Sequence, residues 1–270
     1  MQRRRFLSST LAASALGIGA SARSAFAAPE TTAEGGRRQY YELRHYHFES
    51  SEQHKLTDGY LRNALVPGLN RLGVSPVGVF GVTIGIESSS LYVLIPSSSV
   101  ETLVTAEFHL ASDANYMKAA EEYLHAPAKA PAYVRVESSL MIAFEGKPTV
   151  TVPPVTADHG ARVFELRTYE SPSDFDHRRK VEMFHSGEFG IFEKAGFWQI
   201  FYGDTLVGPR MPNLTYMIGF PSLTERDAKW KAFFDDPDWK KLSGSPRFNF
   251  ESIVTNVDNL ILSPTAYSQI

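Results

Sequence analysis

The sequence predicts an α+β fold in which two ferredoxin-like βαββαβ repeats pack sheet to sheet as an intramolecular pseudo-dimer. One observation is a duplicated strand motif, since residues 41–46 read YELRHY and residues 164–169 read FELRTY. The other is that the strands expected at 91–95 and 197–203 are apolar on both faces. Strands buried on both sides lose the alternation of apolar and polar residues. Helices cover only one face of such a sheet, so we expect the other repeat's sheet to cover the second face.

Residues 1–27 have the three parts of an export signal. Residues 3–7 (RRRFL) match a twin-arginine pattern, residues 11–20 are weakly apolar, and residues 25–27 (AFA) are suited to cleavage. The apolar run is too short to span a bilayer. We predict export by the twin-arginine route to the periplasm or another extracytoplasmic compartment. N-terminal sequencing of the mature protein should find Ala28 first, and a chain that keeps Arg3 would contradict this expectation.

Length and composition are those of an ordinary globular protein, with 270 residues of which 43% are hydrophobic. Removing the four arginines of residues 1–27 leaves 23 basic against 30 acidic residues, a formal charge of −7. Nucleic acid is therefore not expected as a partner, because phosphate binding needs a basic face. The absence of cysteine excludes disulfides, thiolate metal sites and cysteine nucleophiles.

The first repeat, residues 40–146, follows an aperiodic linker at residues 28–39. Leucines spaced by three and four residues predict its first helix, which should kink at Pro67 and end at Gly73. The predicted elements are a strand, a helix, a strand pair, two short helices and a closing strand, at 40–48, 61–72, 77–84 with 91–95, 100–124 and 133–144.

The second repeat, residues 162–263, has the same order of elements. A proline-rich linker at 147–161 precedes it, and a C-terminal tail at 264–270 follows. Gly196 should end its first helix as Gly73 does in the first repeat. Residues 222–225 (SLTE) form a capping box, and Asp236 should cap a short helix that begins with proline. The predicted elements lie at 162–170, 176–195, 197–203 with 214–220, and 250–262. Between the last two, a helix opened by residues 222–225 places Trp230, Phe233 and Phe234 on one face, and a short helix starts at Pro237.

The second repeat resembles the NIPSNAP family. The resemblance rests on residues 164–169, 191–196 (IFEKAG), 212–217 (PNLTYM) and the aromatic and charged residues of 226–240. The first repeat resembles a diverged copy that keeps the opening motif, Gly73 and the strand around Tyr92. The resemblance implies the dimeric α+β barrel, a superfamily that includes cofactor-independent monooxygenases, lactone isomerases and haem proteins. It implies no particular reaction, because NIPSNAP domains have no generally assigned one.

Charged and aromatic side chains share one face of the duplicated strand. If this face lines the barrel, Arg167 presents a planar fork to a carboxylate or enolate ligand, and its pairing with Glu165 offsets the desolvation of both. The alternative is a structural ion-pair cluster that joins the two sheets, and the spacing does not separate the two interpretations. The candidate ligand-binding residues are Glu42, Arg44, Tyr46, Glu165, Arg167 and Tyr169.

Histidines offer weaker candidates for a metal or haem. His45 and His47 lie two residues apart on one strand face, but no third ligand is evident near them in the sequence, so we expect no metal. His185 lies on a predicted helix beside Phe184, and only the superfamily's haem branch suggests it as a haem ligand. No cofactor is expected.

Three functions follow from these observations. The first is an exported barrel that binds a small apolar or acidic ligand. The second is a cofactor-independent monooxygenase or isomerase acting on an enolisable substrate, in which Arg167 stabilises the anion and Glu165 or Tyr169 moves the proton. The third is a haem protein. The expected assembly is the intramolecular pseudo-dimer, with a further homodimer possible, and no transmembrane segment is expected.

Overall fold

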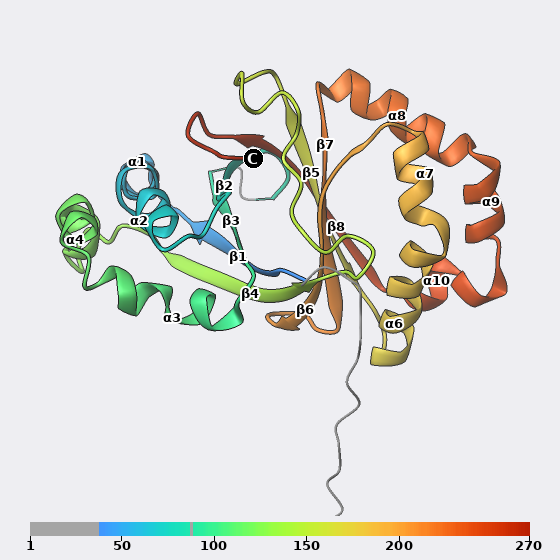
Figure 1. The fold of residues 1–270 in the computed structure, drawn as a ribbon, viewed down its shortest axis with the longest axis horizontal. Coiled ribbons are helices and arrows are strands. Elements are labelled where there is room, and N and C mark those ends of the chain that lie inside the picture. The colour runs from blue at the N-terminus through green and yellow to red at the C-terminus, as the bar shows by residue number, and fades with distance from the viewer. Residues whose placement is uncertain (1–37, 87–88) are drawn as a thin grey trace, which may run out of the picture. The chain divides into compact units, whose positions relative to one another are not determined.

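The computed structural model describes residues 38–86 and 89–270. The predicted export signal and most of the 28–39 linker lie outside the described residues. The described residues form eight strands, labelled in Figure 1. They are β1 (Tyr40–His47), β2 (Gly78–Ile84), β3 (Leu91–Ser97), β4 (Arg135–Ala143), β5 (Val163–Glu170), β6 (Trp198–Val207), β7 (Asn213–Phe220) and β8 (Asn256–Pro264).

Each half of the described chain carries its own helices. Those of the first half are α1 (Ser51–Tyr60), η1 (Leu61–Leu65), α2 (Val66–Arg71), α3 (Val100–Leu110), α4 (Ala114–Ala119) and α5 (Glu121–Leu124). Those of the second half are α6 (Asp174–Met183), η2 (Phe184–Glu188), α7 (Phe189–Lys194), α8 (Leu223–Asp235), α9 (Pro237–Ser243), η3 (Pro246–Phe248) and α10 (Phe250–Ile253). No helix of the described ranges is both long and apolar enough to cross a membrane.

The eight strands form one closed antiparallel barrel in the order β1-β3-β2-β8-β5-β7-β6-β4. Within each half the order is that of a ferredoxin-like sheet, β4-β1-β3-β2 and β8-β5-β7-β6. The halves join where β2 pairs with β8 and β4 pairs with β6. The predicted pseudo-dimeric α+β barrel is therefore confirmed, and edge pairing leaves neither sheet with an open edge.

Three apolar cores explain why the strands are apolar on both faces. One core fills the barrel and includes Phe80, Phe164, Met217 and the fully buried Ile270. The other two lie between the outer face of each half-barrel and its own helices. A strand such as β7, which is buried along its whole length, thus separates two buried layers.

Local sequence signals place the helix ends. Gly73 and Gly196 adopt positive φ angles of 77° and 76°, where L side chains are strained, and they end equivalent helices as predicted. Ser222 accepts a hydrogen bond from the backbone N–H of Glu225, which confirms the predicted cap of α8. Asp236 likewise caps α9.

The first helix of each half contains a π-helical turn, η1 and η2, that the sequence did not predict. In η1 the N–H of Val66 donates to the carbonyl of Leu61, so the wider turn comes directly before Pro67, where a kink was expected. In η2 the N–H of Phe189 donates to Phe184 in the same way. Both halves therefore widen the helix at corresponding positions.

Candidate functional site

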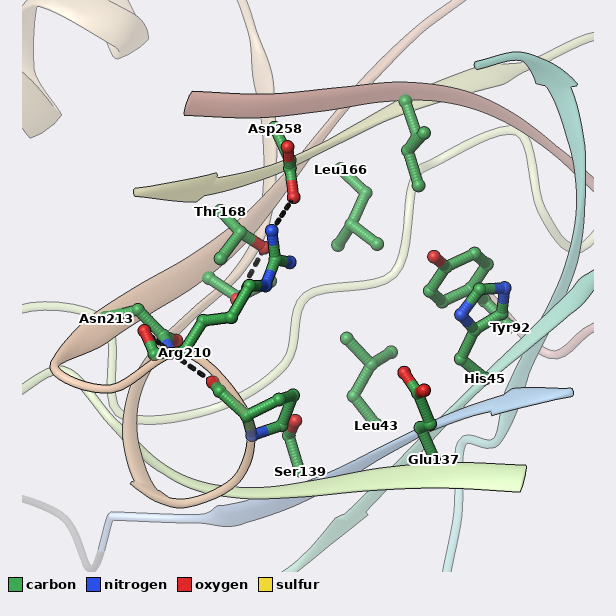
Figure 2. A pocket seen from close by; sticks show the side chains of 13 residues that line it. Leu43, His45, Tyr92, Glu137, Ser139, Leu166, Thr168, Arg210, Asn213 and Asp258 are labelled. Atoms are coloured by element: carbon green, nitrogen blue, oxygen red, sulfur yellow. Dashed lines mark hydrogen bonds and ion pairs between the residues drawn. The ribbon is translucent and has the colours of Figure 1, made fainter. Parts of the chain in front are cut away.

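A cavity of about 90 Å³ lies inside the barrel, between strands of both halves. Leu43, Leu166 and Leu260 form its apolar part, and hydroxyl and ionisable side chains form the rest (Figure 2). Its position follows from strand alternation, because every second residue of β1 and β5 points into the barrel. The lining residues are Leu43, His45, Tyr92, Glu137, Ser139, Leu166, Thr168, Pro209, Arg210, Asn213, Thr215, Asp258 and Leu260.

Arg210, on the connection between β6 and β7, forms one wall of the cavity (Figure 2). Its Nη1 lies 3.0 Å from Oε1 of Glu170 and also pairs with the carboxylate of Asp258. The Nδ2 of Asn213 donates to the Arg210 carbonyl at 3.0 Å, and Oγ1 of Thr205 donates to Oδ1 of Asn213 at 2.6 Å. Burial lowers the pKa of Arg210, but the hydrogen bond and charge of Asp258 raise it more. The guanidinium is thus a positioned, permanently charged donor.

His45 and Glu137 lie across the cavity from Arg210 (Figure 2). The ring of His45 stacks on Tyr92, with centroids 4.1 Å apart and planes at 11°. β1 and β4 pair so that His45 and Glu137 are direct cross-strand neighbours. The cavity therefore places a cation on one side and two titratable groups on the other.

The candidate residues predicted from the duplicated strand do not line this cavity. Their side chains point to the outer face of the barrel, as the membership of Tyr46 and Tyr169 in the helix-covered cores shows. The condition that this face lines the barrel is not met, because Leu43 and Leu166 occupy the inward positions. The candidate residues Glu42, Arg44, Tyr46, Glu165, Arg167 and Tyr169 instead lie on the face that the helices cover.

The second half of the chain, which contains β5, is similar to a known family. Residues 164–269 match the family model NIPSNAP. The second half of the chain is a NIPSNAP domain. This result confirms the resemblance inferred from its motifs. No curated protein sequence is significantly similar to the chain.

Solved structures resemble the chain at low sequence identity. An uncharacterized NIPSNAP-like domain protein from Burkholderia xenovorans is 21% identical over 41% of this chain and 90% of that chain, with a TM-score of 0.37. A putative monooxygenase from Lactobacillus acidophilus NCFM is 9% identical over 84% and 94%, with a TM-score of 0.53. A putative monooxygenase from Fusobacterium nucleatum subsp. nucleatum ATCC 25586 is 7% identical over 85% and 93%, also at 0.53. The last two likenesses span both halves and show a shared barrel fold.

Within the NIPSNAP domain, Glu165 is the centre of a buried polar network. Its Oε1 accepts from Nη1 of Arg167 at 2.5 Å, and its Oε2 accepts from Nε of Arg226 at 2.6 Å and Nε1 of Trp230 at 2.8 Å. Glu165 is 0% exposed. Burial raises the pKa of this carboxyl, but the hydrogen bond from Arg226 and the charge of Arg167 lower it more, so the net shift is downward. The network joins β5 to α8 and leaves both oxygens of Glu165 occupied.

The corresponding cluster of the first half is held in a similar way. Arg44 donates to both carboxylate oxygens of Glu42, at 2.7 and 3.0 Å, and to Glu107 of α3 at 2.7 Å. Ser138 of β4 also donates to Glu42, at 2.8 Å. In both halves the motif therefore forms an ion-pair cluster that joins a central strand to the helix that covers it. This agrees with the structural interpretation of the motif, except that the cluster joins strand to helix and not one sheet to the other.

His185, in η2 of the NIPSNAP domain, has both ring nitrogens engaged within the chain. Nδ1 lies 2.9 Å from the carbonyl of Val181, and Nε2 accepts from the N–H of Gly146 at 3.1 Å. A haem iron would need one of these nitrogens. The geometry therefore does not favour His185 as a haem ligand.

Arg210, Glu137 and Asp258 were missed from the sequence. Each lies on a different segment, and no spacing rule links them. The one sequence signal for the cavity was strand alternation. It places His45 on the same strand face as Leu43, and Thr168 on the same strand face as Leu166.

Proposed function

We propose that this protein is an exported barrel that binds a small molecule in the cavity between its two halves. One observation carries the proposal. Apolar side chains fill the barrel core, whereas this cavity combines leucines with hydroxyl groups, a charged guanidinium, the imidazole of His45 and the carboxylates of Glu137 and Asp258. Such a mixture of apolar walls and few polar groups is typical of ligand sites. The export part rests on the sequence signal of residues 1–27.

The proposed ligand is a small acid that takes the place of Asp258 on Arg210. Its volume of about 90 Å³ is below the ~300–1,000 Å³ common for drug-sized ligands. Arg210 can present its planar fork to a ligand carboxylate in exchange for Asp258. The hydroxyls of Ser139, Thr168 and Thr215 supply further donors and acceptors. A short carboxylic or 2-oxo acid fits these features.

The test is ligand-observed NMR with a panel of two- to six-carbon carboxylic and 2-oxo acids. We expect at least one acid to bind, and Arg210→Gln to weaken its affinity about tenfold or more, because hydrogen bonds to charged groups contribute about 1.5–3 kcal/mol. Arg178→Gln is the matched control, since Arg178 is exposed on α6. Absence of binding across the panel, or equal affinity in Arg210→Gln, would contradict the proposed site.

The same spectra in D₂O address the alternative enzyme function. The cavity holds titratable groups, His45 and Glu137, opposite the Arg210 cation. These groups are better placed to take a proton from an enolisable acid than Glu165 is, because Glu165 is buried and both of its oxygens already accept hydrogen bonds. Exchange of the ligand's α-protons with solvent deuterium, lost in Glu137→Gln, would support an enzyme over a binding protein.

A further inference from the structure

We propose that His45, His47 and Glu137 bind one divalent transition-metal ion at the edge of the barrel cavity. One donor atom from each of the three residues lies within 4.8 Å of the others. Among residues 38–86 and 89–270, this is the one group of three or more histidine, cysteine and acidic side chains found to converge in this way. The expectation from sequence that the two histidines lack a third ligand overlooked Glu137.

The barrel register creates the group. His45 and His47 occupy successive inward positions of β1, and their ring centroids are 3.9 Å apart. β4 runs antiparallel to β1 and places Glu137 directly opposite His45. Oε2 of Glu137 lies 3.7 Å from Nε2 of His47. Two residues close in sequence and one distant residue therefore meet on one face of a two-stranded ladder.

The donor spacing suits a small ion. Zinc binds imidazole nitrogen and carboxylate oxygen at about 2.0–2.2 Å, which places tetrahedral donors about 3.3 Å apart. The 3.7 Å between His47 and Glu137 must shrink by about 0.4 Å, and no donor pair needs to shrink by more than about 1.5 Å, because all lie within 4.8 Å. The side chain of Glu137 is 45% exposed and can supply much of this movement by changing its rotamer.

Neighbouring side chains already orient two of the three ligands, and the third, His47, is buried. Tyr92 stacks on the ring of His45, and His47 is 8% exposed. Nε of Arg135 lies 2.9 Å from Oε1 of Glu137, which leaves Oε2 on the histidine side. Partners of this kind fix ligand orientation in metal sites.

The donor set indicates the class of ion. Two imidazoles and one carboxylate suit Zn²⁺, Ni²⁺, Cu²⁺ or Fe²⁺, whereas Ca²⁺ and Mg²⁺ prefer oxygen ligands. Three protein ligands also leave a coordination position open, as in catalytic zinc sites. His45 and Glu137 line the cavity, so the open position is expected to face it. Metal binding itself does not depend on the ligand proposed above.

The experiment uses the full chain without a polyhistidine tag, treated with chelator and then dialysed. Calorimetric titration with ZnCl₂ should show one ion per chain. Glu137→Gln, His45→Gln and His47→Gln should each weaken affinity by at least about tenfold, a loss that even outer-shell partners of metals can cause. His125→Gln, on an exposed helix end, is the matched control and should bind as the unmodified chain does.

Two further readouts keep the test decisive if a histidine variant folds poorly. Co²⁺ should give a visible d–d spectrum that Glu137→Gln alters, and Glu137 is exposed enough for this variant to fold. Zn²⁺ should raise Tm in the unmodified chain more than in Glu137→Gln, because an ion that binds only the folded state stabilises it. Absence of stoichiometric Zn²⁺ binding, or equal affinity in Glu137→Gln and the control, overturns the proposal whatever the acid panel shows.

Discussion

Glu188→Gln should lower the free energy of unfolding by about 3–5 kcal/mol, because it leaves the charge of Lys180 buried without its partner. Nζ of Lys180 lies 2.8 Å from Oε2 of Glu188, and the two side chains are 1% and 3% exposed. Among the described residues, the other groups around the Lys180 ammonium carry no negative charge that could replace the carboxylate of Glu188. The ammonium contacts Sδ of Met183 at 3.5 Å and lies 4.4 Å from the ring centroid of Phe184.

The measurement is chemical denaturation of Glu188→Gln beside the double variant Lys180→Met/Glu188→Gln. Removing the buried charge as well should recover much of the loss, since apolar replacements of buried ion pairs are often neutral or better. Asp235→Asn is the matched control, because its pair with Lys231 is 60–79% exposed and should contribute little. A Glu188→Gln variant as stable as the unmodified chain would show that Lys180 reaches water in solution.

Arg167→Met should lower the free energy of unfolding by about 1.5–3 kcal/mol, the contribution typical of hydrogen bonds to charged groups. The loss should be smaller than for Glu188→Gln, because Arg226 and Trp230 still bind Glu165. Adding Glu165→Gln removes the carboxylate charge and should restore part of the stability. Little loss in Arg167→Met, or a deeper loss in the double variant, would contradict a structural role for the pair.

The pH dependence gives a second readout of the same network. The pKa of Glu165 is lowered in the folded state, so its contribution is complete above the ordinary glutamate pKa of about 4.3 and is lost as pH falls through the folded pKa. Arg167→Met removes part of the lowering. The stability difference between the unmodified chain and Arg167→Met should therefore be largest near neutral pH and shrink below about pH 4. Denaturation curves from pH 7 to pH 3 check this, and a difference that grows with acid would contradict it.

Local signals in the sequence determined the order of elements and many of their ends. The duplicated motif at 41–46 and 164–169 identified the equivalent strands of the two halves, and Gly73 and Gly196 ended the equivalent helices. Serine and aspartate caps set helix starts, as at Ser222 and Asp236. The glycine stops and the caps each depend on residues within about four positions of one another, so the local sequence contains the whole signal.

Only the tertiary structure decided which face of each strand turns toward the barrel interior and which toward the helices. β5 is apolar on one face and carries Glu165 and Arg167 on the other, and both faces are buried. Strand alternation separates the two faces but does not say which one turns toward the barrel and which toward the helices. The covering helix α8 supplies Arg226 and Trp230 to Glu165, and this long-range contact settles the orientation.

The candidate site depended on tertiary structure for the same reason. His45 and His47 were visible as a pair from their spacing alone. Glu137 joins them only through the β1–β4 register, and Arg210 reaches the cavity only because the barrel brings the β6–β7 connection beside β8. The sequence by itself therefore determined the order of the elements in each half. The closed barrel decided which side chains meet, because cross-strand and cross-half contacts join residues that no local pattern links.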